Sequence, residues 1–171
     1  MASGQSALYR FWTLVAGVGE NAHVQRPLEG IRILDLTIWQ QGTYASAVLA
    51  DLGADVLKIE EPQSGDPGRY FDVTKELGLS SYFEAHNRGK RSIALNLKHA
   101  RGREVFFRLA EQADVFLTNF RAAAIKRIGL TYEELSAANP RIVYVQASGH
   151  GTTVTTPTSV RSTSWRRRAA A

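Results

Sequence analysis

Residues 31–36 read Ile-Arg-Ile-Leu-Asp-Leu, a mostly apolar and β-branched run that predicts a buried strand. A turn at Gln40-Gln41-Gly42 follows, and apolar residues then recur at helical spacing until Gly53 ends the pattern. Residues 55–59, Asp-Val-Leu-Lys-Ile, predict a second strand that follows the helix in the sequence. A strand, a helix and a strand in this order are typical of a parallel βαβ unit, and this unit decides the fold class.

The same alternation continues toward the C-terminus. Three more strands are expected at 92–97, 114–117 and 141–146, with helices between them. This order predicts an α/β fold with a mainly parallel sheet. Ligands of such sheets bind beyond the carboxyl ends of the strands, where the strand order reverses. Function is therefore expected at residues 37–42, 59–62, 118–120 and 147–149 and at Lys98.

Composition places the chain among globular proteins and excludes several kinds of site. Hydrophobic residues make up 44% and charged residues 22% of 171 positions, which excludes wholesale disorder. The chain has no cysteine, so disulfides, thiolate nucleophiles and cysteine-ligated metals are excluded. The four histidines lack the spacing of a helical metal pair, and no apolar run reaches the roughly 20 residues of a membrane span. We expect a cytoplasmic protein that binds no metal ion and has no membrane partner.

The formal net charge of +5 is concentrated at the C-terminus. Arg161, Arg166, Arg167 and Arg168 supply four positive charges and residues 161–171 contain no acidic residue, so residues 1–160 carry only +1. Electrostatic binding of nucleic acid requires a basic face on a fold. We therefore expect no nucleic-acid partner.

Common nucleotide and hydrolase motifs are missing from the sequence. One glycine, Gly42, follows the first strand where a dinucleotide site needs G-x-G-x-x-G, and no phosphate-binding P-loop occurs. Ser148 lacks the first glycine of a nucleophile elbow, which favours a turn serine. Residues 87–92, Asn-Arg-Gly-Lys-Arg-Ser, are a candidate anion site, although a solvated basic turn is the favoured interpretation.

Seven motifs follow one another along residues 27–151: PLEGIRILDLT (27–37), LGADVLKIE (52–60), SGD (64–66), NRGKRSI (87–93), ADVFLTNF (113–120), IGLTYEEL (128–135) and NPRIVY (139–144). Together they resemble CoA-transferase family III, which includes formyl-CoA transferase, carnitine CoA-transferase and α-methylacyl-CoA racemase. The resemblance implies a Rossmann-like domain, incomplete relative to the family, that binds CoA or acyl-CoA across its strand ends.

The resemblance also implies positions for the ligand. Three groups of residues would border its parts: Gln40 and Gln41 near the pantetheine and thioester, Leu95, Leu97 and Lys98 along the adenine nucleotide, and Asn119, Phe120 and Arg127 at the nucleotide and its phosphates. Basic side chains can take phosphate oxygens, and an aromatic ring offers a flat apolar face. Thr43-Tyr44 stands where the family usually has Pro-Ala or Pro-Phe.

The activity implied by the resemblance is transfer of CoA from an acyl-CoA donor to a carboxylic acid. An aspartate attacks the donor thioester, forms a mixed anhydride and then carries CoA as an aspartyl thioester. That aspartate is expected beyond Ala171, and no acidic residue follows Glu134. We therefore expect no catalytic residue in this chain and no activity from it alone. The racemase branch of the family stays an alternative, as does a non-catalytic module that binds CoA or a protein and has a functional basic tail.

The two ends of the chain differ in composition from residues 27–151. Residues 1–26 form an extension whose apolar stretch 11–18 favours a packed helix over a signal peptide. Residues 152–171 contain six threonines and three serines without helical or strand periodicity, so we expect an unstructured tail. A frameshift after about Gly151 is our interpretation, because a shifted reading of a GC-rich coding strand yields a family-like segment. The resemblance implies interlocked homodimers in which the C-terminal part returns to complete the large domain. We expect this chain to lack that part, and therefore to expose apolar sheet surface and to self-associate or aggregate.

Overall fold

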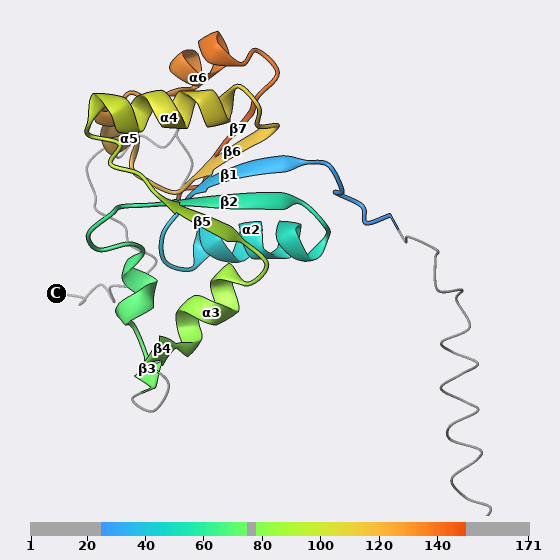
Figure 1. Cartoon of the computed structure of the whole chain (residues 1–171), viewed down its shortest axis with the longest axis vertical. Helices are drawn as coiled ribbons and strands as arrows, with labels where there is room; N and C mark the ends of the chain where they lie inside the picture. The colour runs from blue at the N-terminus through green and yellow to red at the C-terminus, as the bar shows by residue number, and fades with distance from the viewer. Residues whose placement is uncertain (1–24, 75–77, 150–171) are drawn as a thin grey trace, which may run out of the picture.

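The computed structural model describes residues 25–74 and 78–149 (Figure 1). In these residues five strands form one sheet in the order β5-β2-β1-β6-β7, and every neighbouring pair is parallel. The strands are β1 (Arg32–Leu36), β2 (Asp55–Glu60), β5 (Arg91–Ala94), β6 (Val115–Thr118) and β7 (Val143–Gln146). The predicted α/β fold with a parallel sheet is confirmed. The expected N-terminal helix and the tail at 152–171 lie outside the described residues.

Helices cover both faces of the sheet (Figure 1). One face carries α2 (Gln41–Asp51) and α3 (Ser81–Asn87), and the other carries α4 (Ala100–Ala110), α5 (Ala122–Ile128) and α6 (Tyr132–Ala138). Two layers of helices around a parallel sheet explain why the strands read as nearly continuous apolar runs. The helix α2 ends beside Gly53, whose φ of +103° is a conformation that side-chain-bearing residues rarely adopt.

Some predicted strand bounds were wrong, and short elements were missed. The strand expected at 92–97 spans Arg91–Ala94 and ends where its partner β2 ends, since Ala94 pairs with Glu60, the last residue of β2. The strand expected from residue 141 begins at Val143. A 3-10 helix, η1 (Pro67–Tyr70), and a two-stranded ribbon of β3 (Val73–Thr74) and β4 (Leu79–Ser80) were not predicted, since two-residue strands show no alternation.

The main core lies between the sheet and α4, α5 and α6. Phe106 and Phe116 are fully buried there, with ring centroids 5.7 Å apart in an edge-on arrangement. Leu130 and Leu135 complete the same cluster from the α5–α6 side. Burying each such side chain contributes about 2–3 kcal/mol. This core fixes β6 against β1 and so determines where the loops after these strands lie.

The strand order reverses between β1 and β6. The chain runs outward from β1 to β2 and β5, and then returns to the other side of β1 to form β6 and β7. The loops after β1 and β6 therefore leave the sheet toward opposite faces, and ligands of open α/β sheets bind where this happens.

Candidate functional site

The loops after β1 and β6 are joined by one side chain, that of Asn119. Its Oδ1 accepts a hydrogen bond from the Ile38 N–H at 3.0 Å, and its Nδ2 donates to the Ile38 carbonyl at 2.7 Å. Both polar atoms of the amide are thus bonded to the backbone of one residue, 81 positions away in the sequence. The two loops are held together as one unit at the switch point.

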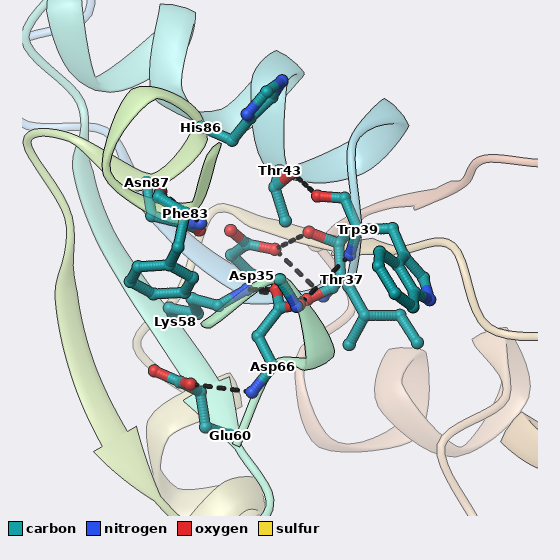
Figure 2. A network of polar contacts seen from close by, with 12 residues as sticks. Asp35, Thr37, Trp39, Thr43, Lys58, Glu60, Asp66, Phe83, His86 and Asn87 are labelled. Carbon is teal, nitrogen blue, oxygen red and sulfur yellow. Dashed lines mark hydrogen bonds and ion pairs between the residues drawn. The ribbon is translucent and has the colours of Figure 1, made fainter. Parts of the chain in front are cut away.

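The backbone N–H and carbonyl groups of residues 37–39 all bond to side chains, and Thr37 and Trp39 with their partners are labelled in Figure 2. The Thr37 N–H donates to a carboxylate at 3.0 Å, and the Thr37 carbonyl accepts from an ammonium group at 2.8 Å. The Trp39 N–H donates to a carboxylate at 3.3 Å, and the Trp39 carbonyl accepts from a hydroxyl. With Ile38 included, the side chains that bind this turn are those of Asp35, Lys58, Asp66, Thr43 and Asn119.

Two buried ion pairs lie beneath this turn. Lys90 Nζ is 3.0 Å from Asp35 Oδ2, and Lys58 Nζ is 2.8 Å from Asp66 Oδ2, with all four side chains almost fully buried. Lys90 also donates to Asn87 Oδ1 and to the Thr43 carbonyl, and such additional hydrogen bonds offset the desolvation of a buried charge. Burial lowers the pKa of Lys90, against the opposing effect of Asp35.

A third carboxylate, Glu60, lies at the end of β2 and continues the polar network. Its Oε2 accepts from the Asp66 N–H at 3.0 Å and from Arg69 Nε at 2.8 Å, and its Oε1 accepts from Arg69 Nη2 and Ser92 Oγ. Burial alone would raise the pKa of Glu60, but the hydrogen bonds from Arg69, Ser92 and the Asp66 N–H lower it to about 2. Glu60 is therefore a charged anchor for the loop that carries Asp66.

Gln40 and Gln41 follow the rigid turn directly, and both are exposed. Gln40 precedes α2, and Gln41, its first residue, donates from Nε2 to the Ser148 carbonyl beyond β7 at 3.4 Å. The next residue must be small, because a Cβ on Gly42 would lie 2.4 Å from Cγ2 of Thr37. The glycine lets α2 begin against the turn, so two amide side chains are presented at the switch point.

The expected nucleotide-binding residues on the β5 side are split between core and surface. Leu95 and Leu97 are half-buried and pack against the main core, whereas Lys98 is exposed. Hydrogen bonds from Ser64 lower the pKa of Glu61, and the nearby charge of Lys98 adds to this lowering. Lys98 therefore lies near the carboxyl end of β2.

The remaining expected residues lie on the β6 side. Phe120 is half-buried against the main core, and its carbonyl accepts from Gln146 Nε2 at 3.3 Å. Arg127 is exposed on α5. Within residues 25–74 and 78–149, no hydrogen bond or ion pair joins Lys98 or Arg127 to the turn at 37–39. The structure thus brings Gln40, Gln41 and Asn119 together and leaves these two cations on flanking elements.

The structure gives no support to the anion site considered at 87–92, and the buried Lys90 also departs from the favoured interpretation of a solvated turn. Arg88 pairs with Asp51, Arg91 pairs with Asp55, and Lys90 pairs with Asp35 below the turn. Each cation of the motif is thus paired within the chain, and the three pairs link this turn and β5 to α2, β2 and β1.

The sequence analysis missed the buried network, although a signal for it exists. Asp35 and Lys58 are charged residues in the interior of their strands, each between apolar neighbours, and they are direct partners in the register of β1 and β2. Charges at such positions are rarely buried unless they are paired. That rule would have marked both residues as members of a polar cluster.

Two further searches cover the part of the chain that the structure describes. None of its helices has the length and apolar character needed to cross a membrane. No group of three or more histidine, aspartate or glutamate side chains in these residues could hold a metal ion.

Comparison with known proteins gives one consistent family. The family model of CoA-transferase family III matches residues 28–163. An acetyl-CoA:oxalate CoA-transferase of Acetobacter aceti is 42% identical over 128 residues, which are 74% of this chain and 32% of the relative. A succinyl-CoA:glutarate CoA-transferase of Mus musculus is 41% identical over 75% of this chain and 29% of the relative. The chain thus spans about one third of the length of these relatives.

Solved structures agree with the sequence comparison. The crystal structure of Rv3272 from M. tuberculosis is similar with a TM-score of 0.68 and 36% identity, over 74% of this chain and 36% of that one. A CAIB/BAIF family protein from Brucella suis is similar with a TM-score of 0.65 and 39% identity, over 70% of this chain and 32% of that one. Sequence motifs, parallel sheet and relatives lead to one conclusion: the chain belongs to CoA-transferase family III.

Proposed function

We propose that this chain supplies the CoA-binding edge of an enzyme that transfers CoA from an acyl-CoA donor to a carboxylic acid. The observation that carries the proposal is the turn at 37–39, held rigid by side chains at the switch point of the sheet, with Gln40 and Gln41 exposed directly after it. A preorganised backbone that presents two amides suits a polar, extended ligand, because little further ordering is needed on binding.

We assign the ligand contacts along this edge from one end of CoA to the other. Gln40 and Gln41 lie at the pantetheine and thioester, and Leu95, Leu97 and Lys98 border the adenine nucleotide. Phe120 offers its ring face, Arg127 takes phosphate oxygens, and Asn119 borders the nucleotide while its amide holds Ile38. The exposure of Lys98 and Arg127 supports their roles, since phosphates are recognised at the protein surface.

The chemistry we propose for the whole enzyme is a double displacement. An aspartate carboxylate attacks the donor thioester and displaces CoA thiolate, which then attacks the aspartyl carbonyl of the anhydride and releases the donor acid. The carboxylate of the acceptor acid then attacks the aspartyl thioester and displaces CoA thiolate. The thiolate attacks the acceptor carbonyl of the new anhydride, so the acceptor leaves as its CoA thioester and the aspartate is regenerated. We place this aspartate outside the 171 residues, so this polypeptide alone binds CoA without turning it over.

The relatives support the transferase branch over the racemase branch. The two named above are transferases for oxalate and glutarate, and a Streptomyces coelicolor relative, 44% identical, is named formyl-CoA:oxalate CoA-transferase. We therefore propose a short dicarboxylic acid as the acceptor.

The first test measures CoA affinity with the complete 171-residue chain by calorimetric titration at fixed salt. Replacing Arg127 with Ala should weaken binding about tenfold, the loss expected for one charge-assisted contact to a phosphate. The matched control is Arg167→Ala, which removes the same charge far away in sequence and should leave the affinity unchanged. Equal losses at both positions would show non-specific attraction between charges, and absence of binding by the unaltered chain would refute the proposed site.

A turnover assay separates binding from catalysis. Incubation of the purified chain with acyl-CoA and a dicarboxylic acid should give no thioester exchange. Exchange above the rate without protein would mean that a nucleophile lies among these 171 residues, against our assignment.

A further inference from the structure

The Lys58–Asp66 ion pair holds the turn at 37–39 from two sides. Lys58 reaches from β2, and Asp66 lies in the loop after that strand, so neither residue belongs to the strands that carry the turn. Lys58 Nζ donates to the Thr37 carbonyl at 2.8 Å, and Asp66 Oδ1 accepts from the Trp39 N–H at 3.3 Å. The pair thus bonds to the backbone on either side of Ile38 (Figure 2).

The contacts of Lys58 and Asp66 with the turn contribute more to the structure than their ion pair does. Asp66 Oδ2 is 2.8 Å from Lys58 Nζ, close enough for an ion pair, yet this oxygen has no well-aligned hydrogen bond within the described residues. Lys58 Nζ also donates a well-aligned hydrogen bond to the Thr37 carbonyl. Buried ion pairs contribute little net stability, because desolvation offsets their attraction. The contacts to the turn are therefore what the pair adds to this structure.

The turn needs such support because Trp39 adopts a strained backbone conformation. Its φ of 63° is in the left-handed region, which is uncommon for a residue with a bulky side chain. Its side chain is 45% exposed, so burial of the ring does not account for that conformation. The Trp39 N–H is bonded to Asp66 and its carbonyl to Thr43, and these bonds fix the direction in which the chain enters Gln40.

We propose that Lys58 and Asp66 are positioning residues, which set the conformation of the turn at 37–39 and thereby the place of Gln40. Only the identity of the ligand at Gln40 rests on the proposed function. The effect on the turn is a property of the chain without any ligand.

The experiment compares the complete chain with the variant Lys58→Met/Asp66→Asn. This variant removes both charges together, so neither charge is left buried without its partner. Amide hydrogen exchange measured by NMR should be about tenfold faster at Ile38 and Trp39, while amides in β6 and α4 keep their protection. CoA affinity, measured by calorimetry, should fall about tenfold, and the melting temperature should change little. If this variant does not fold, Asp66→Asn alone should accelerate the same two amides.

The matched control is Leu135→Ala, a core substitution on α6 that touches neither residue of the pair. It should lower the melting temperature, but the amide exchange rates of Ile38 and Trp39 should not increase relative to those of the other amides. Unchanged exchange at these two amides in the folded double variant would overturn the inference, whatever the CoA affinity. Failure of the unaltered chain to bind CoA would instead overturn the proposed function, and the exchange measurement would still decide the role of the pair.

Discussion

A single carboxylate at the end of β2, Glu60, stays charged in a buried position because four donors surround it. Arg69 binds both of its oxygens, and the Arg69 guanidinium also lies over the Phe83 ring, 3.8 Å from its centroid. Ser92 and the Asp66 N–H complete the set. Since Glu60 fixes the Asp66 backbone, its ionisation state affects the loop that supports the turn at 37–39.

Titration of Glu60 should make stability depend on acid pH. Its pKa is about 2 in the folded protein, against an ordinary value of 4.5, so the unfolded chain binds more protons between these values. The free energy of unfolding should therefore decrease as the pH falls from 4.5 toward 2, and the Glu60→Gln variant should lose this part of the pH dependence. At neutral pH the same variant should be less stable by about 2 kcal/mol. Urea unfolding at several pH values measures both effects.

A control for general acid effects is Glu104→Gln, which changes an exposed carboxylate on α4. It should leave the pH dependence as in the unaltered chain. An equal slope in the Glu60→Gln variant would show that the contacts of Glu60 do not stabilise its charged form.

The helix α4 packs closely against the segment that precedes it. A Cβ added to Gly102, in the first turn of α4, would lie 2.1 Å from the carbonyl oxygen of Asn96. This obstacle is backbone, so it cannot rotate away. Gly102 therefore permits α4 to pack directly on the segment that carries Leu95, Leu97 and Lys98.

Replacing Gly102 with Ala should force α4 and that segment apart. We expect a loss of about 1–3 kcal/mol in the free energy of unfolding, in spite of the higher helix propensity of alanine. CoA affinity should fall as well, if the nucleotide lies against Lys98. Gly149→Ala is the matched control, because no atom lies within 4 Å of the added Cβ there, and its effect on stability should be small. Equal effects of the two substitutions would contradict this account of the packing.

The helices and strands show which structural features can be predicted from local sequence patterns. The longer strands and helices were predicted because burial of a parallel sheet on both faces leaves an apolar run that can be read locally. The regions 37–42 and 118–120 followed from the rule for strand ends, and the family resemblance then singled out Gln40, Gln41 and Asn119 within them. The contacts of this site could not be read in this way, since the Asn119–Ile38 clamp spans 81 positions and the Lys90–Asp35 bond spans 55. Such pairs depend on sheet order and register, which no local pattern specifies.

At the scale of the whole molecule, β7 forms one edge of the sheet in the described residues and carries exposed apolar side chains. In the described residues β7 pairs only with β6, and Val143 and Val145 are 55% and 38% exposed. An unpaired strand edge with apolar side chains is a template for association. This feature supports our expectation of self-association, and the homodimers implied by the family resemblance are consistent with it.

Charges on β7 should reduce association of the 171-residue chain. The variant Val143→Lys/Val145→Lys should shift sedimentation velocity profiles toward the monomer, because lysines at a strand edge oppose strand addition. The control Val105→Lys places one charge on an exposed apolar position of α4 and should leave the profile unchanged. A monomeric unaltered chain, or equal shifts from both variants, would contradict a role for β7.

The central place of β1 in the sheet has a consequence for the order in which the protein folds. Among the described strands β1 is synthesised first, and its partner β2 follows within the next few dozen residues, whereas Ile33 pairs with Val115 of β6 only across 82 positions. Closing a long loop has a larger entropic cost than closing a short one, so contacts of high sequence separation form late. A nascent chain can therefore assemble β1, β2 and β5 as an early half and dock β6 and β7 afterwards. The seam between these halves is the switch point itself, so we expect the bond of Asn119 to Ile38 to form late, when β6 docks on β1.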